Sequence, residues 1–402
     1  MELESMPQFL ENKTILVTGA TGFLAKAFVE KILRVQPNVK RLYLLIRASD
    51  VASATERLHN EVIGKDLFRV VREKWGVNLD SFISEKIIAV PGDVSYENLG
   101  VEDCKRRKDM CKEIDIILNS AATTDFDERY DVALGINTFG ALHVSGFARN
   151  CINLKALLHV STAYVCGEKK GRILERPFQM GETLNGTSRL DIKAEKEVAE
   201  EYLNKLRLLG ATDTAITSAM KDLGIKRAKL FGWPNTYVYT KAMGEMLLGR
   251  FRENLPLVII RPTMISSTYK EPFSGWIEGV RTFDGVIVAY GKGKLKCFLG
   301  HRETILDIVF EIVNAVICQY KYKDMIIDLK KRIKSGMRLA ELYKPYVFFT
   351  GRFDDSNTEK LRMATSESGV DAHLFGFDPM CIDWEDYLLN THIPGLKKYA
   401  LK

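Results

Sequence analysis

The chain has 402 residues, of which 46% are hydrophobic and 27% are charged, and its formal net charge is +6 at pH 7. A chain of this length can bury a large core in one or two domains. The mild positive charge is spread along the sequence, which excludes the concentrated basic surface of a typical nucleic-acid-binding protein. The seven cysteines show no CxxC spacing, so we expect reduced thiols rather than a disulfide framework or a zinc site.

The amino-terminal segment 1–13 contains acidic residues and no apolar run, so no signal peptide is expected there. The longest apolar window, residues 304–320, is interrupted by Asp307 and Glu311 and is predicted to form an amphipathic helix. A transmembrane helix needs about 20 predominantly apolar residues. The sequence therefore predicts a cytoplasmic protein without a transmembrane span.

Residues 14–33, TILVTGATGFLAKAFVEKIL, combine an apolar strand, a glycine turn and an amphipathic helix. Gly19 permits the turn, Gly22 lets a phosphate approach the backbone, and the small Ala25 lets the helix pack closely on the strand. A glycine turn alone can be a simple tight loop. Because a strand precedes this one and a helix follows it, the segment predicts a site for a dinucleotide pyrophosphate.

Further strand-like segments alternate with helix-like segments along the chain. We expect these strands at residues 41–47, 86–90, 114–120, 156–161 and 257–261. Alternation of this kind is typical of a parallel sheet with helices on both faces. The predicted fold class is therefore α/β, a Rossmann-type doubly wound parallel sheet.

A long insertion, about residues 167–233, follows the fifth strand and includes a charged helix over 188–207 whose charges are predicted to face solvent. The later part of the chain contains a basic segment, 321–334, and an aromatic stretch, 343–349. The basic segment predicts either a helix that contacts a membrane surface or a solvated helix, and the residues leave both open.

Tyr237 and Lys241 are four residues apart, which places both side chains on one face of a helix. An ammonium near a phenol favours the phenolate, so Tyr237 is the candidate acid for a developing alkoxide and Lys241 its support. The alternative is a surface helix with a packed tyrosine, but the upstream glycine turn favours a catalytic pair. Tyr239 has no such partner, because Met243 lies four residues after it.

The fifth strand ends in HVSTAYVCG, where a hydroxyl could polarise a substrate carbonyl. Thr162 is the first candidate for this role and Ser161 the second; the alternative is a hydroxyl that caps the backbone. Asn137 is expected to anchor a water molecule or a backbone kink behind the site. The alternative is a purely structural role. His143 and His159 lie in apolar sequence and are expected to be core histidines.

The cofactor choice depends on the end of the second strand, where an acidic residue favours NAD and a basic residue favours NADP. This chain has Arg47 there, which predicts NADPH, whereas Asp50 is a candidate helix cap. No metal site is predicted. The candidate cofactor contacts are Thr18, Gly19, Thr21, Gly22, Phe23, Leu24, Arg47, Asp93, Ala121, Lys241, Pro262 and Thr263.

Several motifs together resemble one family. The segments TGATGFLAKAFVEKIL, HVSTAYVCG, KLFGWPNTYVYTKAMGE, PLVIIRPTMI, GWIEG and IDWEDYLLNTHIPGL resemble the alcohol-forming fatty acyl-CoA reductases, most closely the plant branch, within the extended short-chain dehydrogenase/reductase superfamily. The resemblance covers residues 8–299 and resumes over 343–402. It is specific, because Thr162 and Tyr237 are 75 positions apart, much further than in sugar-nucleotide relatives.

The resemblance implies an NADPH-dependent reduction of a long-chain fatty acyl-CoA to a primary alcohol, with a bound aldehyde between two hydride transfers and release of CoA. Thr162 and Tyr237 would hold the carbonyl oxygen, and Lys241 would support Tyr237. The insertion at 167–233 would lie over the acyl chain. The implied setting is lipid and wax biosynthesis, with peripheral association at the endoplasmic reticulum membrane as one option.

The chain departs from the family pattern between Leu299 and Tyr343, where it looks shortened. We therefore expect a reductase domain over 1–299 and a smaller, mainly helical, shortened domain over 300–402. Two alternatives stay open: an NADPH-dependent aldehyde or ketone reductase, and a nucleotide-binding but inactive variant. The sequence sets neither the acyl chain length nor the oligomeric state.

Overall fold

The computed structural model describes residues 5–186, 189–281, 283–293, 338, 340–367 and 374–401. The expected amphipathic helix at 304–320 and the basic segment at 321–334 lie outside the described residues.

The core of the fold is a six-stranded sheet in which every strand pair is parallel, in the order β3-β2-β1-β4-β5-β7. All six predicted strands and the predicted fold class are confirmed. The strands are β1 (Thr14–Thr18), β2 (Arg41–Ile46), β3 (Ile87–Pro91), β4 (Ile116–Asn119), β5 (Ala156–Val160) and β7 (Leu257–Ile260).

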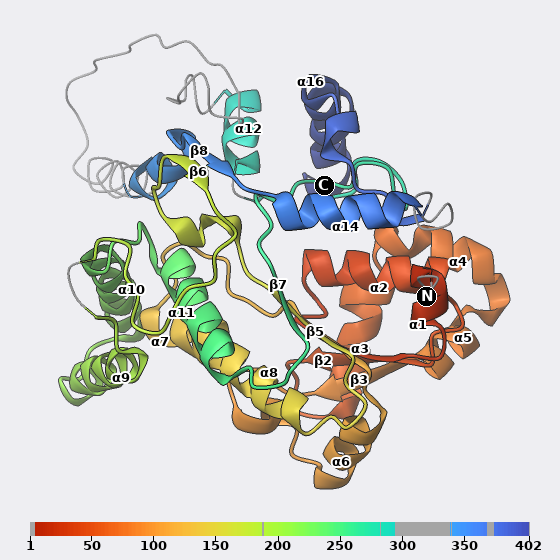
Figure 1. Ribbon diagram of the computed structural model, residues 1–402, viewed down its shortest axis with the longest axis horizontal. Coiled ribbons are helices and arrows are strands. Elements are labelled where there is room, and N and C mark those ends of the chain that lie inside the picture. The colour runs from red at the N-terminus through yellow and green to blue at the C-terminus, as the bar shows by residue number, and fades with distance from the viewer. Residues whose placement is uncertain are drawn as a thin grey trace.

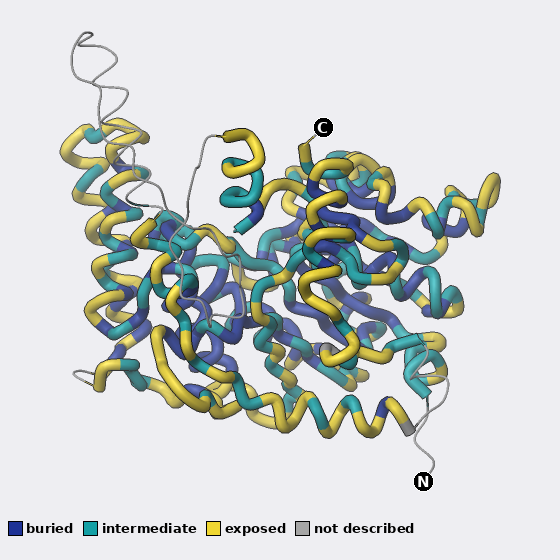
Figure 2. Tube along the Cα trace, turned by 90° about the horizontal axis from the view of Figure 1, so that it is seen from above, coloured by how far each residue is buried: buried dark blue, intermediate teal, exposed yellow. Residues whose placement is uncertain are grey.

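Helices cover both faces of this sheet because successive strand side chains point to opposite faces. In β1, Ile15 and Val17 pack into one buried cluster, whereas Leu16 packs into another. The first cluster involves α2 (Phe23–Val35), α3 (Val51–Leu58), α4 (Arg69–Trp75) and α5 (Leu79–Lys86). The opposite face carries α6 (Cys104–Glu113), α8 (Gly140–Arg149) and α11 (Thr236–Phe251). Figure 2 shows the buried segments gathered in the centre of the molecule, between these layers.

The insertion contains a helical hairpin made of α9 (Ile192–Leu208) and α10 (Asp213–Leu230), at the left edge of Figure 1. The predicted helix at 188–207 begins later than expected, at Ile192. The reason is Asp191, whose carboxylate accepts the N–H groups of Lys193 at 2.9 Å and Ala194 at 3.2 Å and so caps the helix.

One charged residue of α9 is buried, although the sequence predicted that the charges of this helix face solvent. Glu195 is only 2% exposed, pairs with Arg227 on α10, and accepts a hydrogen bond from the Tyr130 hydroxyl at 2.6 Å. A buried carboxylate needs such partners, because its desolvation is otherwise costly. This cluster therefore fixes the hairpin to α7 (Tyr130–Ala133).

Other α-helices and strands of the described residues lie near the amino terminus or in the later part of the chain. They include α1 (Met6–Leu10), α12 (Asp284–Gly291), a helical segment at 340–347, β8 (Gly351–Phe353), α14 (Ser356–Glu367), α16 (Trp384–Asp386) and α17 (Ile393–Gly395). Strand β8 pairs in parallel with β6 (Gly171–Ile173) at the start of the insertion. Among the described residues, no helix combines the length and the apolar content needed to cross a bilayer.

A buried polar cluster holds the end of the chain to the loop after β7. His392 lies 3.0 Å from an Asp284 oxygen through Nε2 and 3.1 Å from the Ser267 hydroxyl through Nδ1. The Tyr387 hydroxyl donates to the Ser267 carbonyl at 2.8 Å. Ser267 is buried and its hydroxyl also contacts Tyr387, so this serine, histidine and aspartate act as a structural anchor rather than as a hydrolytic triad.

The glycine turn depends on Gly19. Its φ is +67°, and an added Cβ would lie 2.7 Å from the Ala121 Cα, just after β4. We expect Gly19→Ala to lower the free energy of unfolding by about 2–4 kcal/mol, from a strained φ plus a backbone clash. Urea unfolding measures this. Gly146→Ala in α8, where the nearest atom lies 3.8 Å away, is the control and should be neutral or stabilising; equal losses in both variants would contradict the explanation.

Candidate active site

The helix α11 brings the two predicted catalytic side chains to the carboxyl edge of the sheet. It begins at Thr236 because the Asn235 side chain accepts the Val238 N–H at 3.1 Å and caps the helix. Lys241 is 1% exposed, and its ammonium donates to the Val160 carbonyl, at the end of β5, at 2.8 Å. The helix and the strand end are therefore joined at the lysine.

Tyr237 lies one turn before Lys241 and contacts Thr162. The Thr162 side chain is within hydrogen-bond reach of the Tyr237 phenol and also accepts the Tyr164 N–H at 3.4 Å. Burial raises the pKa of Tyr237 to about 12, and the hydrogen bond with Thr162 opposes this rise. This differs from the sequence expectation that Lys241 makes the phenol easier to ionise: burial and Thr162 set this pKa, and the Lys241 ammonium is directed to the Val160 carbonyl.

Burial has the opposite effect on the lysine. It lowers the pKa of Lys241 to about 8, and the Glu245 carboxylate, one turn further along α11, acts against this decrease. Glu245 is itself buried and paired with Arg261, with a 3.0 Å contact to the guanidinium Nε. The site thus contains a protonated phenol and an ammonium that loses its proton in mildly alkaline solution.

Of the two hydroxyl candidates, Thr162 is the one in contact with Tyr237. Ser161 is 3% exposed and its hydroxyl has no hydrogen-bond partner among the described residues. Because strand side chains alternate, Ser161 faces the side that also carries His159. The geometry thus brings Thr162, rather than Ser161, to the phenol.

A buried chain of hydrogen bonds connects three strand ends beneath the site. The Thr18 hydroxyl donates to the Asn119 amide oxygen at 2.8 Å and accepts the Ala121 N–H at 3.1 Å. The Asn119 amide nitrogen lies 2.9 Å from His159 Nδ1. Burial lowers the pKa of His159, which fits the expected core histidine. The Thr18 side chain, a predicted cofactor contact, is therefore turned into the protein.

The start of α2 fits a dinucleotide pyrophosphate. Gly22 occupies the N-cap position of this helix and is exposed. Because glycine has no side chain, no side chain accepts the first N–H groups of α2. Unpaired N–H groups at a helix start attract phosphate. Thr21, Phe23 and Leu24 are half-buried around this turn, and the Phe23 ring stacks on Trp276 at 4.9 Å between centroids.

The end of β2 carries Arg47, which is exposed. Asp50 caps α3 and accepts the Ser53 N–H at 2.8 Å, so it has the cap role that the sequence suggested. After β3, the Asp93 carboxylate accepts the Ser95 N–H at 2.8 Å.

Pro262 and Thr263 follow β7 at the same edge. The Pro262 carbonyl accepts the Ala163 N–H at 2.9 Å, next to Thr162, whereas Thr263 is exposed. Every predicted cofactor contact thus lies at or just after the carboxyl end of a strand, or on α2 or α11.

Asn137 lies in a widened helical turn, residues 134–139, before α8. Its amide nitrogen donates to the Thr240 hydroxyl and to the Thr123 carbonyl, both at 3.1 Å. The backbone of α11 approaches so closely that a Cβ on Gly244 would lie 2.4 Å from the Asn137 carbonyl oxygen. In the described residues Asn137 therefore ties this turn to α11.

Two aromatic residues beside Tyr237 were not assigned to the site from sequence. The Phe126 ring, in the loop after β4, stacks on Tyr237 at 6.1 Å and on Tyr346 at 4.8 Å between centroids. The only sequence signal was the aromatic stretch 343–349, which contains Tyr346 and does not by itself indicate a partner.

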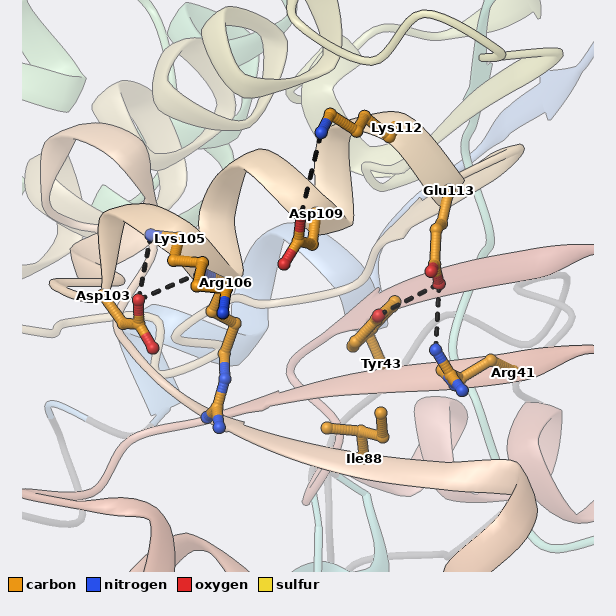
Figure 3. A pocket seen from close by; sticks show the side chains of 9 residues that line it. All are labelled: Arg41, Tyr43, Ile88, Asp103, Lys105, Arg106, Asp109, Lys112 and Glu113. Atoms are coloured by element: carbon orange, nitrogen blue, oxygen red, sulfur yellow. Dashed lines mark hydrogen bonds and ion pairs between the residues drawn. The ribbon is translucent and has the colours of Figure 1, made fainter.

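A separate pocket of about 390 Å³ lies at the opposite edge of the sheet (Figure 3). It lies between the amino end of β2 and α6, where the Glu113 carboxylate binds Arg41 at 3.0 Å and accepts the Tyr43 hydroxyl at 3.2 Å. It includes no predicted site residue. Within the described part of the chain, no group of three or more histidine, cysteine, aspartate or glutamate residues could hold a metal ion.

Two models of the Male sterility protein family match the chain, an NAD-binding model over residues 17–316 and a second model over residues 303–402. An alcohol-forming fatty acyl-CoA reductase of Simmondsia chinensis is 45% identical, over 100% of this chain and 99% of the relative. The chain belongs to the fatty acyl-CoA reductase family. Fatty acyl-CoA reductase 1 of Arabidopsis thaliana is 47% identical, over 98% of this chain and 99% of that protein.

The alignments with these relatives contain more positions than the chain has residues. The alignment of this reductase with the Simmondsia chinensis relative extends over 491 positions, whereas the chain has 402 residues. Among solved structures, the terminal R domain of the myxalamid PKS-NRPS pathway matches with a TM-score of 0.50 at 18% identity, over 96% of this chain and 91% of that domain. This likeness shows the fold. The NAD-binding family model shows that the cofactor is a nicotinamide dinucleotide.

Proposed function

We propose that this reductase converts a long-chain fatty acyl-CoA to a primary alcohol with NADPH, through a bound aldehyde and with release of CoA. The observation that carries the proposal is the contact of Tyr237 with Thr162 beside Lys241, in a chain of this family. A phenol, a hydroxyl and an ammonium that lie together at the carboxyl edge of the sheet are the groups that a carbonyl reduction needs.

The three side chains have distinct roles in this proposal. Thr162 and Tyr237 donate hydrogen bonds to the substrate carbonyl oxygen, where negative charge develops. Tyr237 then gives its proton to the alkoxide formed from the aldehyde, and its raised pKa keeps that proton available at neutral pH. Lys241 stabilises the resulting phenolate and holds the cofactor ribose. The nicotinamide, when bound, supplies the hydride.

The cofactor would lie across the carboxyl edge. The exposed start of α2, with Gly19, Thr21, Gly22, Phe23 and Leu24, would hold the pyrophosphate. Asp93 and Ala121 would border the adenine, and Pro262 and Thr263 the nicotinamide. We assign these roles to a reductase domain of residues 1–299, with the insertion 167–233 over the acyl chain and the shortened domain 300–402 beside it.

The choice of NADPH over NADH depends on Arg47. Its guanidinium can bind a 2′-phosphate, and the nearby Asp50 is occupied as a helix cap. We expect Arg47→Ala to weaken NADPH binding by roughly 10- to 100-fold and to leave NADH binding nearly unchanged. Titration of both dinucleotides by fluorescence measures this. An unchanged NADPH/NADH ratio would assign the 2′-phosphate to another residue.

One assay tests the proposed function against its alternatives. Purified protein is incubated with NADPH and acyl-CoAs of several chain lengths, and the lipid products are identified. Fatty alcohol supports the proposal. Reduction of added aldehyde but not of acyl-CoA would indicate an aldehyde or ketone reductase, and cofactor binding without turnover would indicate an inactive variant.

The location of the protein is also a proposal. We infer a cytoplasmic enzyme that associates peripherally with the endoplasmic reticulum membrane, because its proposed substrate partitions into lipid and segment 321–334 is basic. Flotation with anionic and neutral liposomes tests this, and absence of binding to both would contradict it.

A further inference from the structure

The C-terminal part of the chain reaches the catalytic helix through one tyrosine. Tyr346, in the helical segment 340–347, is 6% exposed, and its phenolic oxygen accepts a hydrogen bond from the Asn235 amide at 2.7 Å. Asn235 is the residue that caps α11, and its own side chain is fully buried. A single amide therefore joins the start of the catalytic helix to a segment 111 residues away.

The Tyr346 ring also supports the catalytic phenol through Phe126. Tyr346 and Phe126 stack at 4.8 Å, and Phe126 stacks in turn on Tyr237. On its other side, Tyr346 meets the edge of Tyr164 at 5.0 Å and 88°. The Phe126 carbonyl accepts the N–H of Thr236, the first residue of α11, at 3.1 Å. The rings and the backbone thus meet at the turn that carries Tyr237.

Charged contacts fix the same segment in place. Arg338, just before it, binds the Asp127 carboxylate in the Phe126 loop and the Asp222 carboxylate on α10, the latter at 2.7 Å. After it, β8 pairs with β6. A partly buried ion pair with Asp127 and an exposed one with Asp222 precede the segment, and strand pairing follows it, so contacts on both sides restrict the position of Tyr346.

We propose that Tyr346 is a positioning residue for Tyr237: it holds the amino end of α11 and the Phe126 ring so that the phenol keeps its place beside Thr162. The inference rests on the proposed function for its effect on catalysis. It also means that the described C-terminal part of this shortened chain retains the contact that the catalytic helix needs.

Tyr346→Phe keeps the ring and removes the hydrogen-bonded oxygen. We expect kcat for acyl-CoA to fall roughly five- to tenfold, while KM and the NADPH dissociation constant stay within twofold, because one hydrogen bond is lost and no substrate contact changes. Asn235→Ser keeps a capping hydroxyl but removes the amide donor, so it should lower kcat to a similar extent. The double variant should be no slower than the slower single variant.

Hydrogen–deuterium exchange gives a readout that does not depend on turnover. Tyr346→Phe should raise the exchange rates of the amides in residues 235–241 by roughly fivefold. Tyr343→Phe is the matched control: its ring lies 5.4 Å from Phe126, and we expect neither exchange nor kcat to change.

The two proposals fail in different ways. If the wild-type protein makes no alcohol but Tyr346→Phe still accelerates exchange at 235–241, the proposed function fails and the positioning role stands. If Tyr346→Phe leaves both exchange and kcat within twofold of the wild type, or if the two single variants multiply their effects on kcat, the positioning role is wrong.

Discussion

Tyr237→Phe is expected to reduce alcohol formation by roughly 10²- to 10⁴-fold, the usual contribution of a positioned general acid. The variant keeps the ring that stacks on Phe126 but loses the proton that a developing alkoxide would receive. Burial keeps the phenol protonated well above neutral pH, so the wild type has a proton to donate that the variant lacks. Stopped-flow oxidation of NADPH, with product identification, measures the loss.

Cofactor binding should survive this change, because the proposed pyrophosphate site lies at the start of α2. Tyr239→Phe is the matched control on the same helix: Tyr239 is fully buried, and its hydroxyl interacts with Tyr130 and Glu195 rather than with Thr162. We expect its activity to stay within twofold of the wild type. Full activity of Tyr237→Phe would reject the assigned acid.

Lys241→Met is expected to lower kcat/KM by roughly 10²- to 10³-fold, because it removes the ammonium to which we assign stabilisation of the phenolate. In the wild type, kcat/KM should fall as the pH rises through about 8, because Lys241 of the free enzyme loses its proton there. The rate profile between pH 6 and 10 measures this. A profile that stays flat to pH 10 would mean that the charged lysine is not required.

The same lysine makes stability depend on pH. Its pKa is about 8 in the folded protein against 10.5 as the ordinary value, so between these values the unfolded chain binds more protons than the folded one. The free energy of unfolding should therefore rise with pH across this window. In Lys241→Met this rise should be smaller than in the wild type, whereas Lys205→Met, on the exposed face of α9, should leave it unchanged.

The strand, turn and helix around Gly19 could be predicted from sequence because their signals are local. β-Branched residues, a glycine spacing and a helical apolar period all lie within residues 14–33, and the other five strands have equally compact apolar runs. The pairing of Tyr237 with Lys241 is local in the same sense, since four residues make one helical turn.

Burial could not be predicted in the same way. The sequence favoured an easily ionised Tyr237 and solvated charges on α9, but burial raises the pKa of the phenol and Glu195 lies in the core. Desolvation is the sum of contributions from segments far apart in the chain, so no neighbouring residue reveals it. Likewise, Thr18 has the position of a cofactor contact but a side chain committed to Asn119.

The sequence by itself determined the sheet, the glycine turn and the tyrosine–lysine spacing, because each depends on residues that are close together in the chain. Only the tertiary structure decided that Thr162 rather than Ser161 meets the phenol, and that Tyr346 bonds the cap of α11. These contacts join segments separated by 75 and 111 positions, and they form only when packing of the whole fold brings the segments together.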